Sequence, residues 1–240
     1  MVDSIKDAII LAGGKGERLR PHTNDRPKPM VEVGGKPIFE YQLDQLIKGG
    51  VRRVVFACSY KREVLMDYVG DGSRYGIKVL YSVEEEPLGR GGGIKKAMKV
   101  LGSFRDLEEK IIITNGDNLW KLNINSLVEK SDNALATVVV VPLRSPYGVV
   151  DFNQQDQIIG FKEKPILPYW INAGIYVFNR EIKDLLPDVG DHETETFPNL
   201  AKDKFLVFKS QDYWRGVDTA KDLTDAEKEV EEVFKDGDVS

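Results

Sequence analysis

The sequence predicts an α/β protein with a doubly wound, mostly parallel sheet and a strand-rich C-terminal half. The first observation is the apolar run at residues 8–12, which is typical of a buried parallel strand. The second is the alternation of strand-like and helix-like segments through residues 8–114. The third is the succession of strands beyond residue 134, with few helices between them. No linker or repeat interrupts the chain, so we expect a single domain over 1–240, with halves at about 1–120 and 121–240.

The spacing of apolar residues, and the glycines that end helices, predict the helices and strands of the first half. Residues 38–47 carry apolar side chains at helical spacing and are followed by Gly49-Gly50, which ends a helix. The strand at 8–12 is expected to lie centrally, with ligands at the carboxyl ends of the strands. The expected strands are 8–12, 52–58, 77–83 and 110–114, and the expected helices are 38–47, 62–69 and 93–101.

The second half predicts mostly strands, followed by one amphipathic helix. Apolar residues at helical spacing define that terminal helix, namely Leu223, Ala226, Val230 and Val233. The expected strands are 135–141, 148–152, 157–161, 171–178 and 205–209.

Composition limits the classes of partner and compartment. Lys and Arg number 34 against 39 acidic residues and form no basic block, which argues against nucleic acid as a partner. The start lacks the pattern of a signal peptide, and no apolar run approaches a membrane span. The single Cys58 lies in an apolar run and is expected to be a buried hydrophobe; a chain with no internal disulfide suits a reducing compartment. We therefore expect a cytoplasmic protein without a membrane partner.

The glycine-rich segment after the first strand is the strongest candidate for a ligand site. Gly13-Gly14-Lys15-Gly16-Glu17-Arg18 lets the backbone approach a ligand and direct N–H groups at phosphate oxygens. Pro27-Lys28-Pro29 then holds a lysine in an extended segment. Arg18 and Lys28 supply the two cations that a triphosphate requires, although a glycine-rich turn can also be purely structural.

Two common phosphate loops are excluded. A Walker A loop needs Ser or Thr after its lysine, whereas Lys15 is followed by Gly16. A dinucleotide fingerprint needs a third glycine where this chain has Leu19, and a helix where it has Pro21. The loop is therefore expected to be long and irregular, ending near Pro37, and to hold something other than a dinucleotide.

Two carboxylates stand where a metal ion could be held. Asp117 follows the apolar strand at 110–114, at the ligand edge of such a sheet, and could bind Mg²⁺ on phosphates. Asn-Gly-Asp is equally typical of a plain turn. Asp218 precedes the terminal helix, where it or Thr219 could simply cap that helix.

The second half contains two further motifs but no nucleophilic triad. Glu163-Lys164-Pro165 closes a strand, and Asn172-Ala173-Gly174 opens one; their structural alternatives are a surface strand end and a β-bulge. His22 and His192 are both expected in loops and are too few for a zinc cluster. A phosphate nucleophile is already ionised at neutral pH, so positioning and charge neutralisation are sufficient.

In this order, the motifs resemble those of the sugar-1-phosphate nucleotidyltransferases (nucleotide-sugar pyrophosphorylases), from about residue 7 to 225. Residues 84–97 look most like the short guanylyltransferases for mannose 1-phosphate and D-glycero-D-manno-heptose 1-phosphate. The resemblance implies a Rossmann-like fold of the nucleotide-diphospho-sugar transferase type, with a nucleotide-binding first half and a sugar-phosphate second half. It implies transfer of a nucleoside monophosphate from an NTP to a sugar 1-phosphate, with Mg²⁺ as cofactor. The chain has no room for the C-terminal β-helix domain of longer relatives.

The resemblance also implies roles for individual residues. Arg18, Lys28 and Asp117 would be catalytic, and Asp117 and Asp218 would hold the metal. Asp218 stands two places beyond the usual guanylyltransferase carboxylate and looks more like that of the cytidylyltransferases. The nucleotide would contact Leu11, Ala12, Gly13, Gly14, Lys15, Gly16, Arg18, Lys28, Glu84, Pro87 and Gly89. The sugar phosphate would contact Gly148, Glu163, Lys164, Asn172 and Gly174.

The acidic segment at residues 84–86 is the basis for predicting which nucleotide is preferred. Guanine presents two adjacent donors that a carboxylate can accept, whereas uracil and thymine present flanking carbonyls. Glu84 is the expected reader, which favours GTP. Arg90, where the guanylyltransferases usually have Thr, could instead donate to another base. The alternatives are CTP- or UTP/dTTP-dependent transfer to a sugar phosphate or to a phosphocholine-like acceptor, caged by Tyr169 and Trp170. A non-catalytic regulatory subunit is disfavoured, and homo-oligomerisation is left open.

Overall fold

A seven-stranded sheet forms the centre of the protein in this computed structural model, which describes residues 5–103 and 107–235. Four neighbouring strands are mutually parallel: β6 (Lys110–Asn115), β1 (Asp7–Ala12), β4 (Arg53–Cys58) and β5 (Lys78–Val83). β11 (Ile166–Asn179) runs antiparallel between β6 and β8 (Ala136–Arg144), and β12 (Phe205–Lys209) closes the edge parallel to β8. The order is β12-β8-β11-β6-β1-β4-β5, so the predicted mostly parallel α/β sheet is confirmed, with β1 in its interior.

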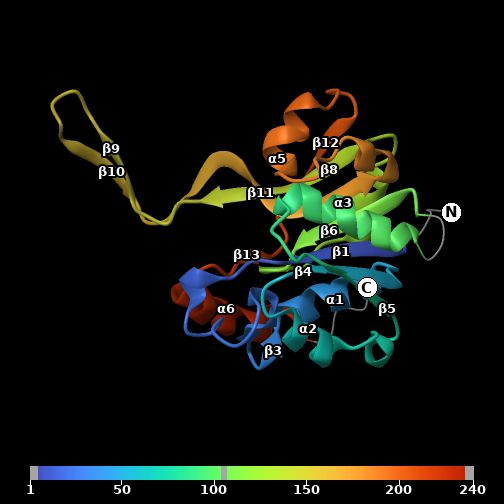
Figure 1. The fold of residues 1–240 in the computed structure, drawn as a ribbon. Coiled ribbons are helices and arrows are strands. Elements are labelled where there is room, and N and C mark those ends of the chain that lie inside the picture. Colours follow the sequence, from blue (N-terminus) through green and yellow to red (C-terminus); the bar gives the residue numbers. More distant parts are fainter. Residues whose placement is uncertain (1–4, 104–106, 236–240) are drawn as a thin grey trace.

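Helices cover both faces of this sheet, as Figure 1 shows. Ile10 of β1 packs in one core cluster with Phe39 and Leu43, whereas the next residue back, Ile9, packs in a second cluster with Ile94. Alternate side chains of a buried strand thus serve opposite layers, which explains why its sequence is continuously apolar. The helices are α1 (Ile38–Lys48), α2 (Arg62–Val69), α3 (Gly89–Gly102), α4 (Ile124–Lys130), α5 (His192–Glu195) and α6 (Ala220–Val233).

One predicted boundary changes for a steric reason. α3 begins at Gly89 rather than at residue 93, because its glycines allow the loop at 187–192 to approach closely. A Cβ atom on Gly92 would lie 2.4 Å from the carbonyl oxygen of Asp188. The proline-containing loop forms no α-helix, as expected, but contains two single 3-10 turns, η1 (Glu17–Leu19) and η2 (Lys28–Met30). Other 3-10 turns are η3 (Ser73–Tyr75), η4 (Arg180–Asp184) and η5 (Phe197–Asn199).

Short strands add three two-stranded ribbons. β7 (Asn118–Trp120) pairs with β13 (Trp214–Gly216), and β2 (Glu32–Val33) with β3 (Lys36–Pro37). The predicted strands at 148–152 and 157–161 form the hairpin β9 (Val149–Phe152) and β10 (Ile158–Lys162), which pair only with each other. This hairpin stands away from the body of the molecule in Figure 1. β11 is also longer than the predicted 171–178, because it extends back toward the hairpin.

One prediction about the titratable residues was wrong. His192 does not lie in a loop: it begins α5, is fully buried and packs edge-on against Tyr176 and Phe197. Burial disfavours the imidazolium and lowers the pKa of His192 to about 4, so the ring is neutral at pH 7. Cys58 is buried as expected, and burial raises its thiol pKa to about 11, which leaves it unreactive.

Within the described ranges, none of the helices combines the length and apolarity that a membrane crossing requires.

Candidate active site

The glycine loop leaves β1 at its carboxyl end and turns at Gly16. Gly16 has a φ of +61°, and its carbonyl oxygen accepts hydrogen bonds from the Leu19 amide (2.9 Å) and the Thr23 hydroxyl (2.8 Å). A Cβ atom there would lie 2.9 Å from Thr23 Cγ2, so both the conformation and the space require glycine. By contrast, a Cβ on Gly14 would meet nothing within 4 Å, so the backbone of the loop is open on that side to a ligand.

Lys28 is the centre of the site. Its Nζ atom donates to Asp117 Oδ2 at 2.7 Å and to Asp218 Oδ1 at 2.5 Å, although these residues lie 89 and 190 positions away in the chain. Arg18 Nη2 lies 3.0 Å from the same oxygen of Asp218. The Val217 amide donates to the Asp117 carbonyl oxygen (3.1 Å), which fixes the two carboxylate-bearing segments side by side. Two cations and two carboxylates predicted from separate motifs therefore meet at one point.

Asp218 is free to join this centre because another residue caps α6. Thr219 is the N-cap: its hydroxyl accepts from the Asp222 amide, and the Asp222 carboxylate accepts from the Thr219 amide at 2.8 Å. This reciprocal capping box satisfies the first turn of the helix without Asp218. The helix-cap alternative for Asp218 is therefore wrong.

The donor set suits a magnesium ion delivered with phosphates. Asp117 and Asp218 offer hard carboxylate oxygens close enough together to contact one cation in the position of Lys28 Nζ. Mg²⁺ is commonly held by one or two carboxylates, with phosphates and water completing its octahedron. In the part of the chain that the structure describes, no cluster of three or more His, Cys, Asp or Glu residues could hold a metal ion by itself. The residues thus fit a substrate-borne Mg²⁺ rather than a closed structural site.

A cavity of about 400 Å³ opens beside this centre, at the carboxyl ends of β1 and β6. Gly16 and Arg18 do not line it; Gly16 shapes the loop, and Arg18 reaches the centre through Asp218. Ten predicted site residues line the cavity: Leu11, Ala12, Gly13, Gly14, Lys15, Lys28, Glu84, Pro87, Gly89 and Asp117.

Glu84 lines the cavity but already serves the fold. Its Oε2 atom accepts from the backbone amide of Leu88 at 3.1 Å, at the start of α3. A Cβ atom on Gly93 would lie 2.6 Å from Glu84 Oε1, so glycine is needed there for the carboxylate to fit. A carboxylate at a helix N-terminus is favoured by the helix dipole. Recognition of a base by Glu84 remains a prediction. The base would have to bind a carboxylate that already accepts from the Leu88 amide.

A network that sequence reasoning missed joins the cavity to Asn172. Arg90 pairs with Asp191 (2.6 Å) and with Glu193 (2.7 Å). Glu193 Oε1 then accepts from Asn172 Nδ2 (2.6 Å) and from the Tyr176 hydroxyl (2.7 Å). The only sequence signal for Glu193 is its place in the first turn of the four-residue helix α5, which resembles any surface helix start. Arg90 is thus committed to two carboxylates.

Asn172 and Gly174 form an irregular corner of β11 against β6. The Gly174 amide donates to Asn172 Oδ1 at 2.8 Å, and the register against β8 shifts between Asn172 and Tyr176. Gly174 has a φ of +69°, and a Cβ there would lie 2.4 Å from Asn115 Nδ2, the residue that ends β6. The predicted bulge is therefore present, and it brings this corner next to the segment that carries Asp117.

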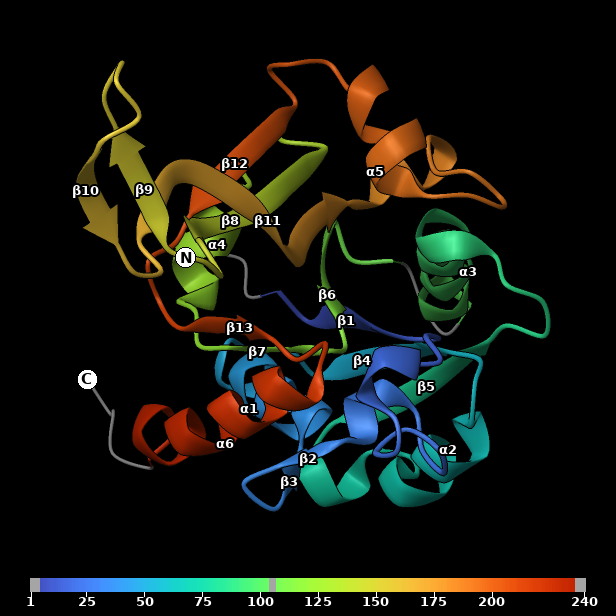
Figure 2. The ribbon, with the colours of Figure 1, turned by 90° about the vertical axis from the view of Figure 1, so that its left-hand side faces the viewer.

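The remaining predicted residues are not brought to the cavity. Gly148, Glu163 and Lys164 lie on or beside the β9–β10 hairpin, which Figure 2 shows to the left of β8 and β12. A Cβ on Gly148 would lie 3.1 Å from Glu163 Oε2, so these two are neighbours. Among the described residues, neither the Glu163 nor the Lys164 side chain has a hydrogen bond or ion pair, and the Lys164 backbone has a φ of +45°.

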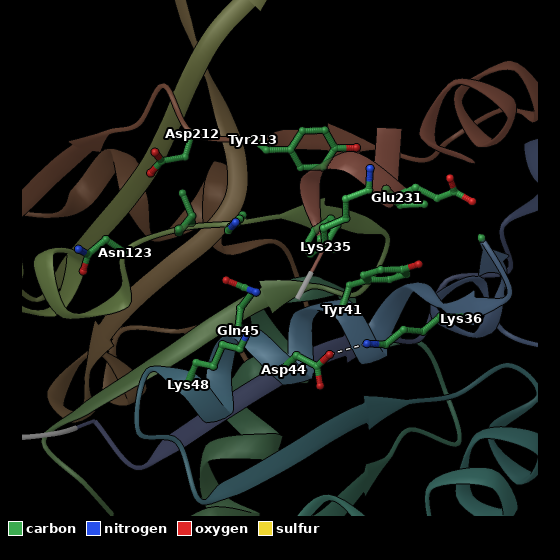
Figure 3. Close-up of a pocket in the computed structure, with 15 residues that line it drawn as sticks. Lys36, Tyr41, Asp44, Gln45, Lys48, Asn123, Asp212, Tyr213, Glu231 and Lys235 are labelled. Carbon is green, nitrogen blue, oxygen red and sulfur yellow. Dashed lines mark hydrogen bonds and ion pairs between the residues drawn. The ribbon is translucent and has the colours of Figure 1, made fainter. Parts of the chain in front are cut away.

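A larger cavity, about 1020 Å³, lies between α1 and α6 and is shown in Figure 3. Lys36 pairs with Asp44 on its wall, and Tyr41 and Tyr213 also line it. None of the predicted site residues lines it, and it shares no lining residue with the cavity beside Lys28. We therefore assign the active site by its chemistry rather than by the size of the cavity.

The fold and this charge centre define a nucleotidyl transferase, and the chain belongs to the family described as Nucleotidyl transferase, which matches residues 7–233. The predicted resemblance is thereby confirmed. The chain is 36% identical over 228 residues to the mannose-1-phosphate guanylyltransferase of Mycobacterium tuberculosis. That match covers 90% of this chain and 62% of the relative, so the chain spans less than two thirds of that protein.

Shorter relatives match almost from end to end. The D-glycero-alpha-D-manno-heptose 1-phosphate guanylyltransferase of Aneurinibacillus thermoaerophilus is 34% identical over 234 residues, covering 94% of this chain and 98% of that one. The crystal structure of HddC from Yersinia pseudotuberculosis superposes with a TM-score of 0.74 at 30% identity, covering 94% and 99% of the two chains. The same protein in complex with GMP-PN gives a TM-score of 0.73.

Proposed function

We propose that the protein is a sugar-1-phosphate guanylyltransferase, which transfers GMP from GTP to a sugar 1-phosphate and releases pyrophosphate. The observation that carries the proposal is Lys28 held between Asp117 and Asp218 at the mouth of a glycine-lined cavity. The guanylyltransferase relatives support the choice of reaction and of GTP. The single buried Cys58 suits the reducing cytoplasm, where we place the protein.

In the proposed reaction, a phosphate oxygen of the sugar 1-phosphate attacks the α-phosphorus of GTP. The new O–P bond forms as the bond between the α-phosphorus and the bridging oxygen breaks, and pyrophosphate leaves with that electron pair. The attacking phosphate is already ionised near neutral pH, so the site needs no general base. Its work is to place the two phosphates in line and to neutralise their charge.

The cations of the site divide this work. The open backbone of Gly13 and Gly14 faces the cavity and can direct N–H groups at the triphosphate. Arg18, exposed at the rim, would neutralise the departing pyrophosphate. Lys28 is neutralised by both aspartates in the structure. Mg²⁺, held by Asp117 and Asp218 with the triphosphate, would screen the phosphate charges. Lys28, beside the cavity, would supply a positive charge to the reacting α-phosphate.

Asp117→Asn and Asp218→Asn are each expected to raise the Mg²⁺ concentration needed for half-maximal activity by roughly tenfold or more, because each removes an anionic oxygen ligand. The measurement is initial rate of pyrophosphate release against Mg²⁺ at fixed GTP. Asp212→Asn is the matched control, since the Asp212 carboxylate accepts from the Ser210 hydroxyl, outside the site. A wild-type Mg²⁺ dependence in Asp218→Asn would remove that residue from the metal site.

GTP is expected to give the highest kcat/KM of the four common NTPs. If Glu84 accepts from guanine, Glu84→Gln should narrow the GTP preference by roughly 10-fold, because a charge-assisted acceptor is lost. Glu86→Gln, a change at an exposed neighbour outside the cavity lining, is the control. An equal loss with every NTP in Glu84→Gln would mean that Glu84 only supports the start of α3.

The proposal as a whole is tested by pyrophosphate release across four NTPs and a panel of hexose, hexosamine and heptose 1-phosphates, with phosphocholine included. Release that needs both GTP and one sugar 1-phosphate supports it. Release with CTP and phosphocholine alone, or with no acceptor at all, contradicts it.

A further inference from the structure

The β9–β10 hairpin and its flanks, residues 146–170, which we call the arm, expose an unusual amount of apolar surface. Tyr147 is 76% exposed, Phe152 66% and Phe161 64%. Ile158 and Ile159, at a register shift of the hairpin, are each 69% exposed. The arm therefore holds several large apolar side chains in solvent, which marks it as an interaction surface.

The arm is also too small to be stable by itself. β9 and β10 pair only with each other within the described residues, and an isolated two-stranded hairpin is marginally stable in water. Its root is nevertheless fixed, since Ile166 pairs with Arg144 and the Ser145 amide donates to the Pro165 carbonyl oxygen at 2.9 Å. Since β8 and β11 direct the root outward, the arm projects from the body rather than covering it (Figure 1).

A matching apolar surface lies at the free edge of the sheet. β12 is the outermost strand, and its Val207 is 42% exposed. A cavity of about 440 Å³ there is lined mainly by apolar residues, with Phe197 and Phe205 among them. Asn172 and Glu193, which belong to the network beside the active site, also line this cavity. An element that covers this edge would therefore end next to the site.

We propose that two copies of this chain pair through their arms. Each arm covers the β12 edge of the other copy and brings Glu163 and Lys164 to the acceptor end of that copy's active site. The role of Lys164 rests on the proposed function, because a sugar phosphate is the anion that its charge would hold. At the Asn172 corner of a single chain, Arg90 is already paired with Glu193 and Asp191.

The arm offers a large part of the surface that a stable dimer needs. Five aromatic side chains along it are 39–76% exposed, so each can still bury a fraction of the roughly 150–250 Å² of a whole aromatic side chain, against the roughly 800 Å² per partner of a standard interface. In a dimer with two-fold symmetry, each copy covers the other copy with its own arm, so both arms are buried together. The exposed residues in this sum are Tyr147, Phe152, Phe161, Tyr169 and Trp170.

The first test is the mass in solution, which does not depend on activity. Light scattering with size-exclusion chromatography is expected to give twice the chain mass for the wild-type protein. Phe152→Ser with Phe161→Ser should give a monomer with an unchanged circular dichroism spectrum, because both side chains are in solvent within one chain. Val64→Ser with Leu185→Ser, which removes exposed apolar residues elsewhere, should remain a dimer. A wild-type monomer over the micromolar range, or a dimer that survives the arm substitutions, overturns the proposal.

The second test asks whether Lys164 acts in its own chain or in its partner. Lys164→Ala and Asp117→Asn chains should each be inactive alone but regain activity when unfolded together and refolded as a mixture. Random pairing gives one intact site in four, so recovery should approach roughly a quarter of wild-type activity. A dimer whose mixture stays inactive, while the wild type is active, shows that the arm serves its own chain and overturns the exchange. A dimer with no wild-type activity on any donor would instead count against the proposed function, and the arm substitutions would still decide the pairing.

Discussion

Lys28→Met is expected to lower kcat/KM on the order of 10³-fold, the largest effect of any single change at the site. Lys28 is the buried cation at the centre, 10% exposed at its side chain, and it contacts both carboxylates at 2.7 and 2.5 Å. The variant removes the charge that the reacting α-phosphate would meet and also leaves Asp117 and Asp218 facing each other unpaired. The measurement is steady-state pyrophosphate release with GTP and the best acceptor of the panel.

The same variant gives a second readout that does not depend on turnover. Two unpaired carboxylates repel each other and attract a divalent cation, so Mg²⁺ should raise the Tm of Lys28→Met more than it raises that of the wild type. Lys36→Met is the control, because that lysine pairs with Asp44 outside the site. Turnover within threefold of wild type, together with equal Tm shifts, would remove Lys28 from the centre of the mechanism.

Arg18→Ala is expected to lower kcat by about 10²–10³-fold while leaving the fold intact. Its side chain is 73% exposed and its ion pair with Asp218 lies at the surface, so it contributes little to stability. We expect Arg18 to act through the positive charge that it places beside the departing pyrophosphate. The turn at Gly16 positions the loop that carries it. Thermal unfolding checks the fold, and single-turnover pyrophosphate release checks the chemistry.

The neighbouring Arg20 provides a matched control for Arg18. Arg20 is also exposed and pairs only weakly with Glu17, at 3.9 Å. Arg20→Ala should keep near-normal turnover. If both alanine variants behave alike, the effect of Arg18 is only that of general surface charge, and its assigned role fails.

The sequence predicted the parts of this protein in which local pattern and tertiary role coincide. Residues 8–12 of β1 are all apolar because the strand is buried on both faces, and Gly16 after it has the positive φ that the turn requires. Lys28 and Asp117 were predicted separately, from prolines and from a strand end, and the parallel sheet brings them together. The boundaries of α1 followed from helical spacing and from the glycines that end it, and α2 spans the predicted residues 62–69.

Other features depend on contacts that no local pattern records. β7 and β13 are three residues each, too short to show a period, yet their pairing places Asp218 beside Asp117. Glu193 accepts hydrogen bonds from Asn172, which is 21 residues away, and from Arg90, which is 103 residues away, so no local pattern could reveal its role. Glu163 and Lys164 were assigned to the sugar phosphate from the resemblance alone, and no local pattern records that the arm carrying them projects from the body of a single chain.

The most direct test of nucleotidyl transfer at the Lys28 centre is ³¹P nuclear magnetic resonance of one reaction mixture containing GTP, Mg²⁺ and the best sugar 1-phosphate. We predict that the GTP and sugar-phosphate signals fall together as pyrophosphate and a coupled pair of diphosphodiester resonances rise in equal amounts, and that Lys28→Met shows neither product on the same timescale. Formation of GDP and inorganic phosphate, or of GMP without a diphosphodiester, would contradict the account.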